Sequence, residues 1–126
     1  MTQLTTSYFA AYKAEMGVAV RTSVGTPHWW VGELEHVRRI TPYGCLGHDD
    51  WAQRYMARLD RLDPDDLGRR FEELSARHDG RPLALLCFEK ARSECHRSLL
   101  ADWLERHGFG RVPEAKPAQM HLEVER

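Results

Sequence analysis

Reactive side chains are concentrated in one short stretch of the sequence, LALLCFEKARSECHR, which begins at residue 83. An apolar run ends at Cys87, and the polar side chains that follow include Glu89, Cys95, His96 and Arg97. Thiol, carboxylate, imidazole and guanidinium groups supply nucleophiles, acids and bases, metal ligands and anion-binding groups. This stretch is therefore the first candidate for a functional site.

The elements around this stretch would bring its polar groups together. In open parallel sheets, ligands bind beyond the carboxyl ends of the strands, where loops lead into helix N-termini. Helical spacing after the apolar run turns His96 toward Cys87 and leaves Arg97 in the first turn, within reach of a carboxylate or phosphate. We therefore predict an anion-accepting pocket at the strand ends, with Cys87, Glu89 and His96 as candidate catalytic residues.

Each of these residues also has a purely structural interpretation. A cysteine at the end of an apolar strand is often a small buried hydrophobic residue. His96 can fill the first turn of a helix and bind a carbonyl, and Arg97 can pair with a neighbouring acid. Their combination at one strand end and one helix start is what favours a site.

The rest of the chain predicts helices that alternate with strands. We expect helices over 5–16, 50–62, 64–80 and 94–107, the last capped by Ser93, and strands over 18–25, 40–46 and 83–88. The clearest start signal is at Asp63, which can cap a helix whose first position suits Pro64. The alternation indicates an α/β fold: a small three-layer Rossmann-like domain with a mainly parallel sheet of three or four strands flanked by helices.

The overall composition limits the classes of function. A chain of 126 residues suits a single domain, with about 112–126 expected as a flexible tail because that segment is polar and proline-broken. The formal net charge of −1 gives no global field that attracts nucleic acid, and no apolar stretch approaches the length that crosses a bilayer. Three cysteines without framework spacing argue against a secreted disulfide scaffold, so we expect a cytoplasmic protein with reduced thiols.

Part of the sequence resembles a known family. CFEKARSECHRSLLADWL resembles the C-terminal signature of the family called domain of unknown function 488, in which a Cys-x-Glu element precedes Cys-His-Arg. The upstream VAVRTSVGTPHWW is similar to that family's first strand, where an arginine at the strand end precedes a proline. The resemblance extends over 18–108 and implies a Rossmann-like α/β fold. It also implies a shared pocket near Arg21, Cys87, Glu89, His96 and Arg97.

The leading hypothesis for the pocket is an enzyme or binder that acts on a phosphorylated or nucleotide-like small molecule. Glu89 would serve in acid–base or glycosyl-type chemistry, while Arg21 and Arg97 would bind phosphate. No Walker loop and no G-x-G-x-x-G follows a predicted strand, so the sequence identifies no cofactor.

Two other chemistries use the cysteines. A sulfurtransferase-like thiol enzyme is an alternative because Arg92 follows Cys87 at a suitable spacing, although the loop between them lacks the small residues that an anion cradle uses. A metal site is a further alternative, since Cys87, Glu89, Cys95 and His96 supply suitable donors. The spacing lacks the paired Cys-x-x-Cys elements of structural zinc, and Cys95 and His96, adjacent on a predicted helix, would diverge by about 100°, so we assign no metal ligands.

The tryptophans support a hypothesis from a different class. Trp29 and Trp30 are consecutive in a predicted loop, so they are candidates for a pocket lid or for an interface with a protein partner. Trp30 is the tryptophan that we assign to ligand binding. The alternative to an enzyme is thus a protein-interaction or regulatory module whose polar cluster is structural.

Overall fold

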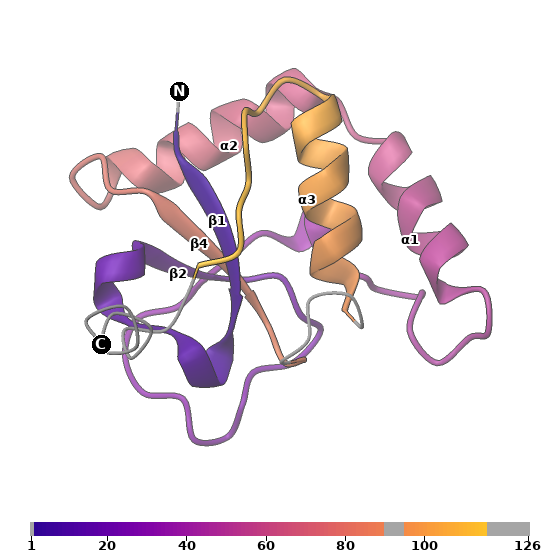
Figure 1. Ribbon diagram of the computed structural model, residues 1–126, viewed down its shortest axis with the longest axis horizontal. Helices are drawn as coiled ribbons and strands as arrows, with labels where there is room; N and C mark the ends of the chain where they lie inside the picture. The colour runs from indigo at the N-terminus through magenta and orange to yellow at the C-terminus, as the bar shows by residue number, and fades with distance from the viewer. Residues whose placement is uncertain (1, 90–94, 116–126) are drawn as a thin grey trace, which may run out of the picture.

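The computed structural model describes residues 2–89 and 95–115. The described chain forms an all-parallel sheet in the order β1-β4-β2-β3, with β1 at Leu4–Tyr8, β2 at Val18–Arg21, β3 at Glu35–His36 and β4 at Leu83–Cys87. Helices α1 (Trp51–Asp60), α2 (Pro64–Ala76) and α3 (His96–Arg106) lie on one side of this sheet (Figure 1). The predicted α/β class with a small parallel sheet is confirmed.

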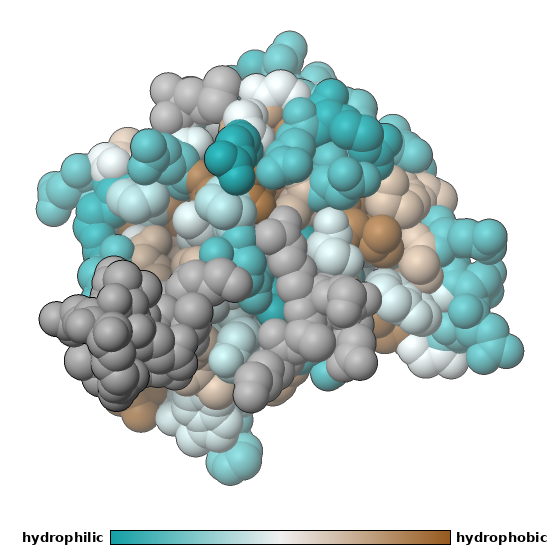
Figure 2. Space-filling model, viewed as in Figure 1, coloured by the Kyte–Doolittle hydropathy of each residue, from teal (hydrophilic) through white to brown (hydrophobic). Residues whose placement is uncertain are grey.

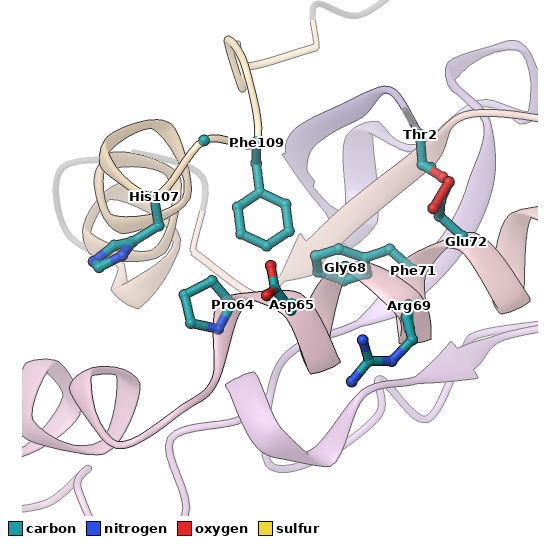
Figure 3. Close-up of a pocket in the computed structure, with 10 residues that line it drawn as sticks. Thr2, Pro64, Asp65, Gly68, Arg69, Phe71, Glu72, His107 and Phe109 are labelled. Carbon is teal, nitrogen blue, oxygen red and sulfur yellow. The ribbon is translucent and has the colours of Figure 1, made fainter.

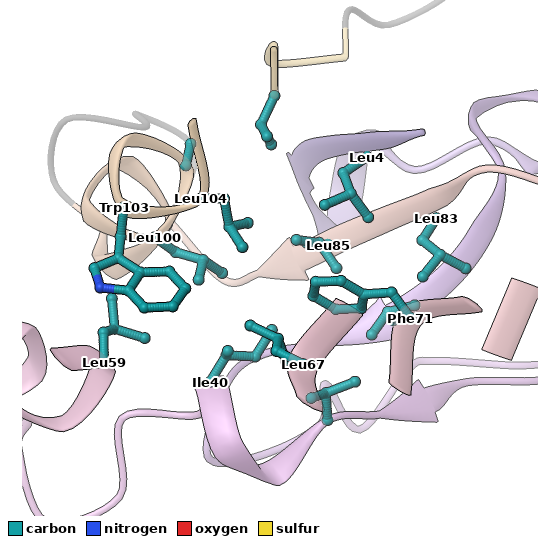
Figure 4. Close-up of a cluster of buried hydrophobic side chains, with 14 of the residues drawn as sticks. Leu4, Ile40, Leu59, Leu67, Phe71, Leu83, Leu85, Leu100, Trp103 and Leu104 are labelled. Atoms are coloured by element: carbon teal, nitrogen blue, oxygen red, sulfur yellow. The ribbon is translucent and has the colours of Figure 1, made fainter. Parts of the chain in front are cut away.

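Strand β4 lies between β1 and β2 and is buried along its whole length, as its unbroken apolar sequence predicts. Its side chains alternate between the two faces of the sheet. Leu83 and Leu85 point toward the helices, into a cluster that includes Phe71, Leu100 and Trp103 (Figure 4). Continued alternation puts Cys87, the last residue of the strand, on this same face.

The opposite face of the sheet has a thinner cover. There Ala84 and Leu86 pack against Phe9 and Ala19 in a smaller hydrophobic cluster. The 3-10 helices η1 (Phe9–Ala11) and η2 (Ala14–Met16), together with the loop that carries Trp30, complete this layer. The third layer is therefore made of short turns and aromatic side chains.

Helices α1 and α2 form where the sequence signals predict helices. The Asp63 carboxylate accepts a hydrogen bond from the Asp65 backbone N–H at 2.9 Å, and Pro64 takes the first helical position of α2. Helix α2 buries the predicted stripe of Leu67, Phe71 and Leu74, and helix α1 buries Tyr55 and Leu59. Local capping and periodicity are sufficient to define both elements.

The helix predicted over 5–16 is wrong. Leu4–Tyr8 is a strand that pairs in parallel with β4, and the two 3-10 helices follow it. Aromatic side chains spaced three or four apart suit either arrangement, and pairing with a buried central strand decides between them. Gly17, at φ +123°, then turns the chain against the Pro82 carbonyl, where any side chain would collide.

The strand predicted over 40–46 is also wrong. The 3-10 helix η3 (Arg38–Ile40) and a series of turns occupy this region. Pro42 lacks a backbone N–H, and Gly44 has φ +75°, so neither suits a strand. The edge of the sheet is instead formed by the two residues of β3.

The first residues of the predicted tail, 112–115, are described in the structure and form hydrogen bonds with β1. Val112 is fully buried, Thr6 donates its backbone N–H to the Pro113 carbonyl at 3.0 Å, and Ala115 donates to the Thr6 carbonyl at 2.7 Å. The segment thus runs alongside β1 and covers that edge. The remainder of the predicted tail, 116–126, lies outside the described residues.

The surface is largely polar on the face shown in Figure 2, above all over α2. Among the described residues, the large hydrophobic side chains that are most exposed are Val31 and Trp29. No helix in the described ranges has the length and apolar character needed to cross a membrane.

Candidate functional site

A cavity of about 320 Å³ opens at the carboxyl ends of β2 and β4, beside the start of α3. We call it the strand-end cavity. The three predicted catalytic residues, Cys87, Glu89 and His96, all line it. Much of the remaining wall is apolar and includes Leu46, Trp51 and Phe88.

Strand alternation explains why polar groups meet at this end of the sheet. Tyr8, at the end of β1, is paired in register with Cys87, and Thr22 directly follows β2, with its backbone N–H bound to the Leu86 carbonyl at 3.0 Å. Tyr8, Thr22 and Cys87 each continue an alternating series that faces the helices. All three therefore approach the first turn of α3.

Cys87 and Cys95 form a disulfide in the structure, so the expectation that all thiols are reduced is wrong for this pair. Both residues are buried, whereas Cys45 is a free, buried thiol elsewhere in the core. Cys95 is the N-cap of α3, with extended backbone angles of φ −131° and ψ 153°, so it lies outside the helical turn that begins at His96. The predicted divergence of about 100° between the Cys95 and His96 side chains assumed that both lie on the helix, so it does not apply to this structure.

Two sequence predictions fall in the loop between these cysteines. The structure begins α3 at His96, slightly later than the predicted helix start. The predicted cap Ser93 and the sulfurtransferase-like Arg92 lie outside the described residues.

Arg97 contacts two of the residues that line the cavity, Cys87 and Glu89. Its side chain is fully buried and forms a bidentate ion pair with Glu114, with Nε–Oε1 at 3.1 Å and Nη2–Oε2 at 2.7 Å. Nη1 lies 3.0 Å from Cys87 Sγ and also donates a hydrogen bond to the Glu89 carbonyl. The guanidinium also lies over the Tyr8 ring, 5.7 Å from its centre. Arg97 is not among the cavity-lining residues, so its predicted role in ligand binding stays a prediction.

His96 is a buried, neutral imidazole. The Thr22 hydroxyl donates to the Leu86 carbonyl at 2.9 Å, so its oxygen accepts from His96 Nε2–H at 3.1 Å. The other ring nitrogen, Nδ1, then carries a lone pair and lies 3.6 Å from Cys95 Sγ. Burial lowers the pKa of His96 to about 4, and the positive charge of Arg97 acts in the same direction.

Neither Arg21 nor Trp30 is among the residues that line the strand-end cavity. Arg21 Nη2 is 2.9 Å from His36 Nδ1, at the β2–β3 edge of the sheet. Trp30 packs on the opposite face, with its ring centre 5.4 Å from that of Phe9 and 5.5 Å from that of Tyr12. The structure therefore does not bring these two residues to the predicted pocket, and their ligand-binding roles stay predictions.

A different pocket, of about 490 Å³, lies between α2 and the chain that follows α3 (Figure 3). Phe109 stands against Gly68 and the Phe71 ring there. None of the predicted site residues lines this pocket. The strand-end cavity is therefore the stronger candidate site.

Sequence reasoning missed three contributors to the site. The orientation of Thr22 could have been predicted, because it lies two residues after Val20 and therefore on the same, core-facing side of the strand. Tyr8 was missed because its segment was assigned to a helix. Glu114 gives no local signal, since its role depends on a contact with Arg97 and with the Thr6 hydroxyl, which donates to Glu114 Oε1 at 2.7 Å.

The fold and the site together define a parallel α/β domain with a buried cysteine pair at its strand ends. The family model described as the active DUF488-N3 subclade (DUF488-N3a) matches residues 46–108, half of the chain. The chain belongs to the DUF488 family, and the predicted resemblance is confirmed. The matched region includes Cys87, Glu89, Cys95, His96 and Arg97. Comparison with curated proteins and with solved structures gave no match.

Proposed function

We propose that the protein is a thiol-dependent enzyme in which Cys87 reacts with a small molecule bound in the strand-end cavity. The observation that carries the proposal is the position of Cys87 Sγ. It lies on the cavity wall, between the Arg97 guanidinium at 3.0 Å and the sulfur of Cys95. A buried cation beside a cysteine sulfur favours the thiolate, which is the nucleophilic form.

The reaction that uses both cysteines is the reduction of a small disulfide. The Cys87 thiolate attacks one sulfur of the substrate, forms a mixed disulfide and releases the other half as a thiolate. The Cys95 thiolate then attacks the Cys87 sulfur, forms the intramolecular disulfide and releases the second half. The substrate gains two electrons from the protein, and the two released thiolates take up the two protons that the cysteines had lost to solvent. A small thiol reductant returns the pair to the dithiol.

The cavity wall favours a compact, partly apolar substrate. Leu46, Trp51 and Phe88 provide apolar surface, and Glu89 contributes a carboxylate rather than a cation. The phosphorylated or nucleotide-like ligand stays a prediction, because the two arginines on which it depended bind protein groups instead. The description of the matched subclade as active supports an enzyme over an interaction module.

The sharpest test is Cys95→Ser, because this variant stops the reaction after the first step. When the reduced variant is incubated with 2-hydroxyethyl disulfide at pH 7, we expect a mixed disulfide to accumulate on Cys87. Cys87→Ser, treated in the same way, is expected to form its adduct on Cys95 at least about tenfold more slowly, because no arginine of the described residues contacts Cys95 Sγ as Arg97 contacts Cys87 Sγ. Mass spectrometry of the intact protein and of its peptides measures both rates.

Cys45→Ser serves as the matched control, since this thiol is buried in the main core and does not line the cavity. It should react as the wild type does. Equal adduct rates on Cys87 and Cys95 in the two variants, or adducts confined to Cys45, would contradict the assignment of Cys87 as the reacting group.

A further inference from the structure

Three metal-ligating atoms converge beside the strand-end cavity. One side-chain donor atom from each of Cys87, Cys95 and His96 lies within 4.8 Å of the others, and all three residues are buried. We propose that the reduced form of this cluster is a Zn²⁺ site with two thiolates and one imidazole as protein ligands. The proposal shares the cysteine pair of the proposed enzyme, but it does not require that pair to turn over a substrate.

The imidazole is already oriented for such a role. Because His96 Nε2–H is used by the Thr22 hydroxyl, the lone pair on Nδ1 is left facing Cys95 Sγ at 3.6 Å. Histidines that bind metals typically fix their ring in this way, by donating the second ring N–H to a neighbouring acceptor. Thr22 is therefore a positioning residue, itself held by the Leu86 carbonyl at 2.9 Å.

The backbone spacing of the cysteines also suits a shared metal ion. Their Cα atoms are 7.5 Å apart, which is wider than the roughly 4.4–6.8 Å that disulfides usually span. Two thiolates at about 2.3 Å from a tetrahedral zinc ion have their sulfurs farther apart than bonded sulfurs are. The separation of the two Cα atoms is therefore compatible with a metal ion held between the two sulfurs.

The charges and donor types favour zinc over a hard cation. Two thiolates neutralise Zn²⁺, while the nearby Arg97 charge is already paired with Glu114. Sulfur and neutral nitrogen ligands select zinc-like ions rather than Mg²⁺ or Ca²⁺. Three protein ligands leave a fourth position, and the adjoining cavity lets water or a small ligand from solution reach it.

Disulfide formation and zinc binding exclude each other at this site, so an oxidant should expel the metal. Diamide takes two electrons from the two thiolates and two protons from water and becomes a hydrazine, while the S–S bond forms and Zn²⁺ leaves. We expect one zinc ion to be released for each disulfide formed.

The test uses the full chain, reduced with a phosphine and freed of metal. We expect wild-type protein to bind one equivalent of Zn²⁺ in competition with a chromophoric chelator, and Co²⁺ to give the sulfur-to-metal charge-transfer band of a tetrahedral thiolate site. Cys95→Ser and His96→Gln should each weaken zinc binding at least about tenfold, as ligand loss does, while Cys45→Ser should bind as the wild type does. Circular dichroism confirms that each variant is folded.

The outcomes separate the metal site from the proposed enzyme. Zinc binding that is equally strong in the wild type and in folded Cys95→Ser would overturn the metal site, whatever the thiol reactivity. Trapping of a mixed disulfide on Cys87 without any zinc binding would leave the enzyme standing and refute the metal site. Zinc binding without any trapping of a mixed disulfide on Cys87 would support the metal site and refute the proposed enzyme.

Discussion

Two arginines stand at the carboxyl edge of the sheet, and their surroundings differ sharply. Arg97 is completely buried, is held by both carboxylate oxygens of Glu114 and contacts the sulfur of Cys87. Arg21 is partly exposed and shares its hydrogen bonds among His36, the Val24 carbonyl and the Thr26 hydroxyl. The same side-chain type is thus a fixed internal charge at one strand end and a solvent-facing group at the other.

The difference shows what a buried charge requires. Removing a guanidinium from water is costly unless an opposite charge and hydrogen bonds replace the water, and Glu114 with the Glu89 carbonyl provides both for Arg97. Arg21 keeps its contact with solvent and therefore needs no carboxylate. Only the first arrangement couples the charge to the packing of the core and to the sulfur of Cys87.

The largest effect should come from removing the buried charge. Arg97→Met leaves the Glu114 carboxylate without its cation in a mostly buried position, so we expect a loss of about 3 kcal/mol in the free energy of unfolding. Urea unfolding followed by circular dichroism measures this. The double variant Arg97→Met/Glu114→Gln should recover part of the loss. A single-variant loss as small as that of an exposed ion pair would show that the pair is not coupled to the fold.

The pH dependence of stability should also differ between the two strand ends. Because burial lowers the folded-state pKa of His96 to about 4, the unfolded chain binds more protons than the folded protein between roughly pH 6.5 and 4. Stability contributed by neutral His96 is complete above this window and decreases through it as the pH falls, by about 3 kcal/mol in total. Unfolding in urea at several pH values, compared with His96→Gln, isolates this contribution.

The pKa of His36 is also lowered, by burial and by the charges of Arg21 and Arg38. This histidine is much more exposed to solvent than His96, so its contribution has the same sign but is smaller. If His96→Gln kept the full pH dependence of the wild type over this window, the assignment to His96 would be wrong.

The smallest effect is expected at the exposed arginine. Arg21→Ala removes contacts with neutral groups at the edge of the sheet, so the free energy of unfolding should fall by less than about 1 kcal/mol. The rate of mixed-disulfide formation on Cys87 should not change. A loss of Cys87 reactivity in this variant would show that the two strand ends act as one site.

Much of the fold could be predicted because its signals are local. The apolar run of β4, the Asp63–Pro64 start of α2 and the stripe of α1 each lie within a few residues. Strand β1 could not be assigned in this way, since Thr5, Thr6 and Ser7 allow several conformations and only pairing with β4 selects one.

The candidate site was located from the sequence, but its internal arrangement was not. The stretch that ends in Cys-His-Arg points to this end of the sheet, where Cys87, Glu89 and His96 line one cavity, and their catalytic roles stay predictions. The approach of Cys95 to Cys87 depends on where α3 begins, and a shift of the helix start by one or two residues changes the direction of both side chains. The pairing of Arg97 with Glu114 joins separate elements and has no local pattern.

The docking of 112–115 along β1 joins distant parts of the chain. Residues 4–106 contain the sheet and α3, but the carboxylate that pairs with Arg97 comes from Glu114. Glu114 also accepts a hydrogen bond from the Thr6 hydroxyl, which lies 108 residues away along the chain. The placement of the carboxylate that faces the charge beside Cys87 therefore depends on β1, α3 and the segment after α3 together.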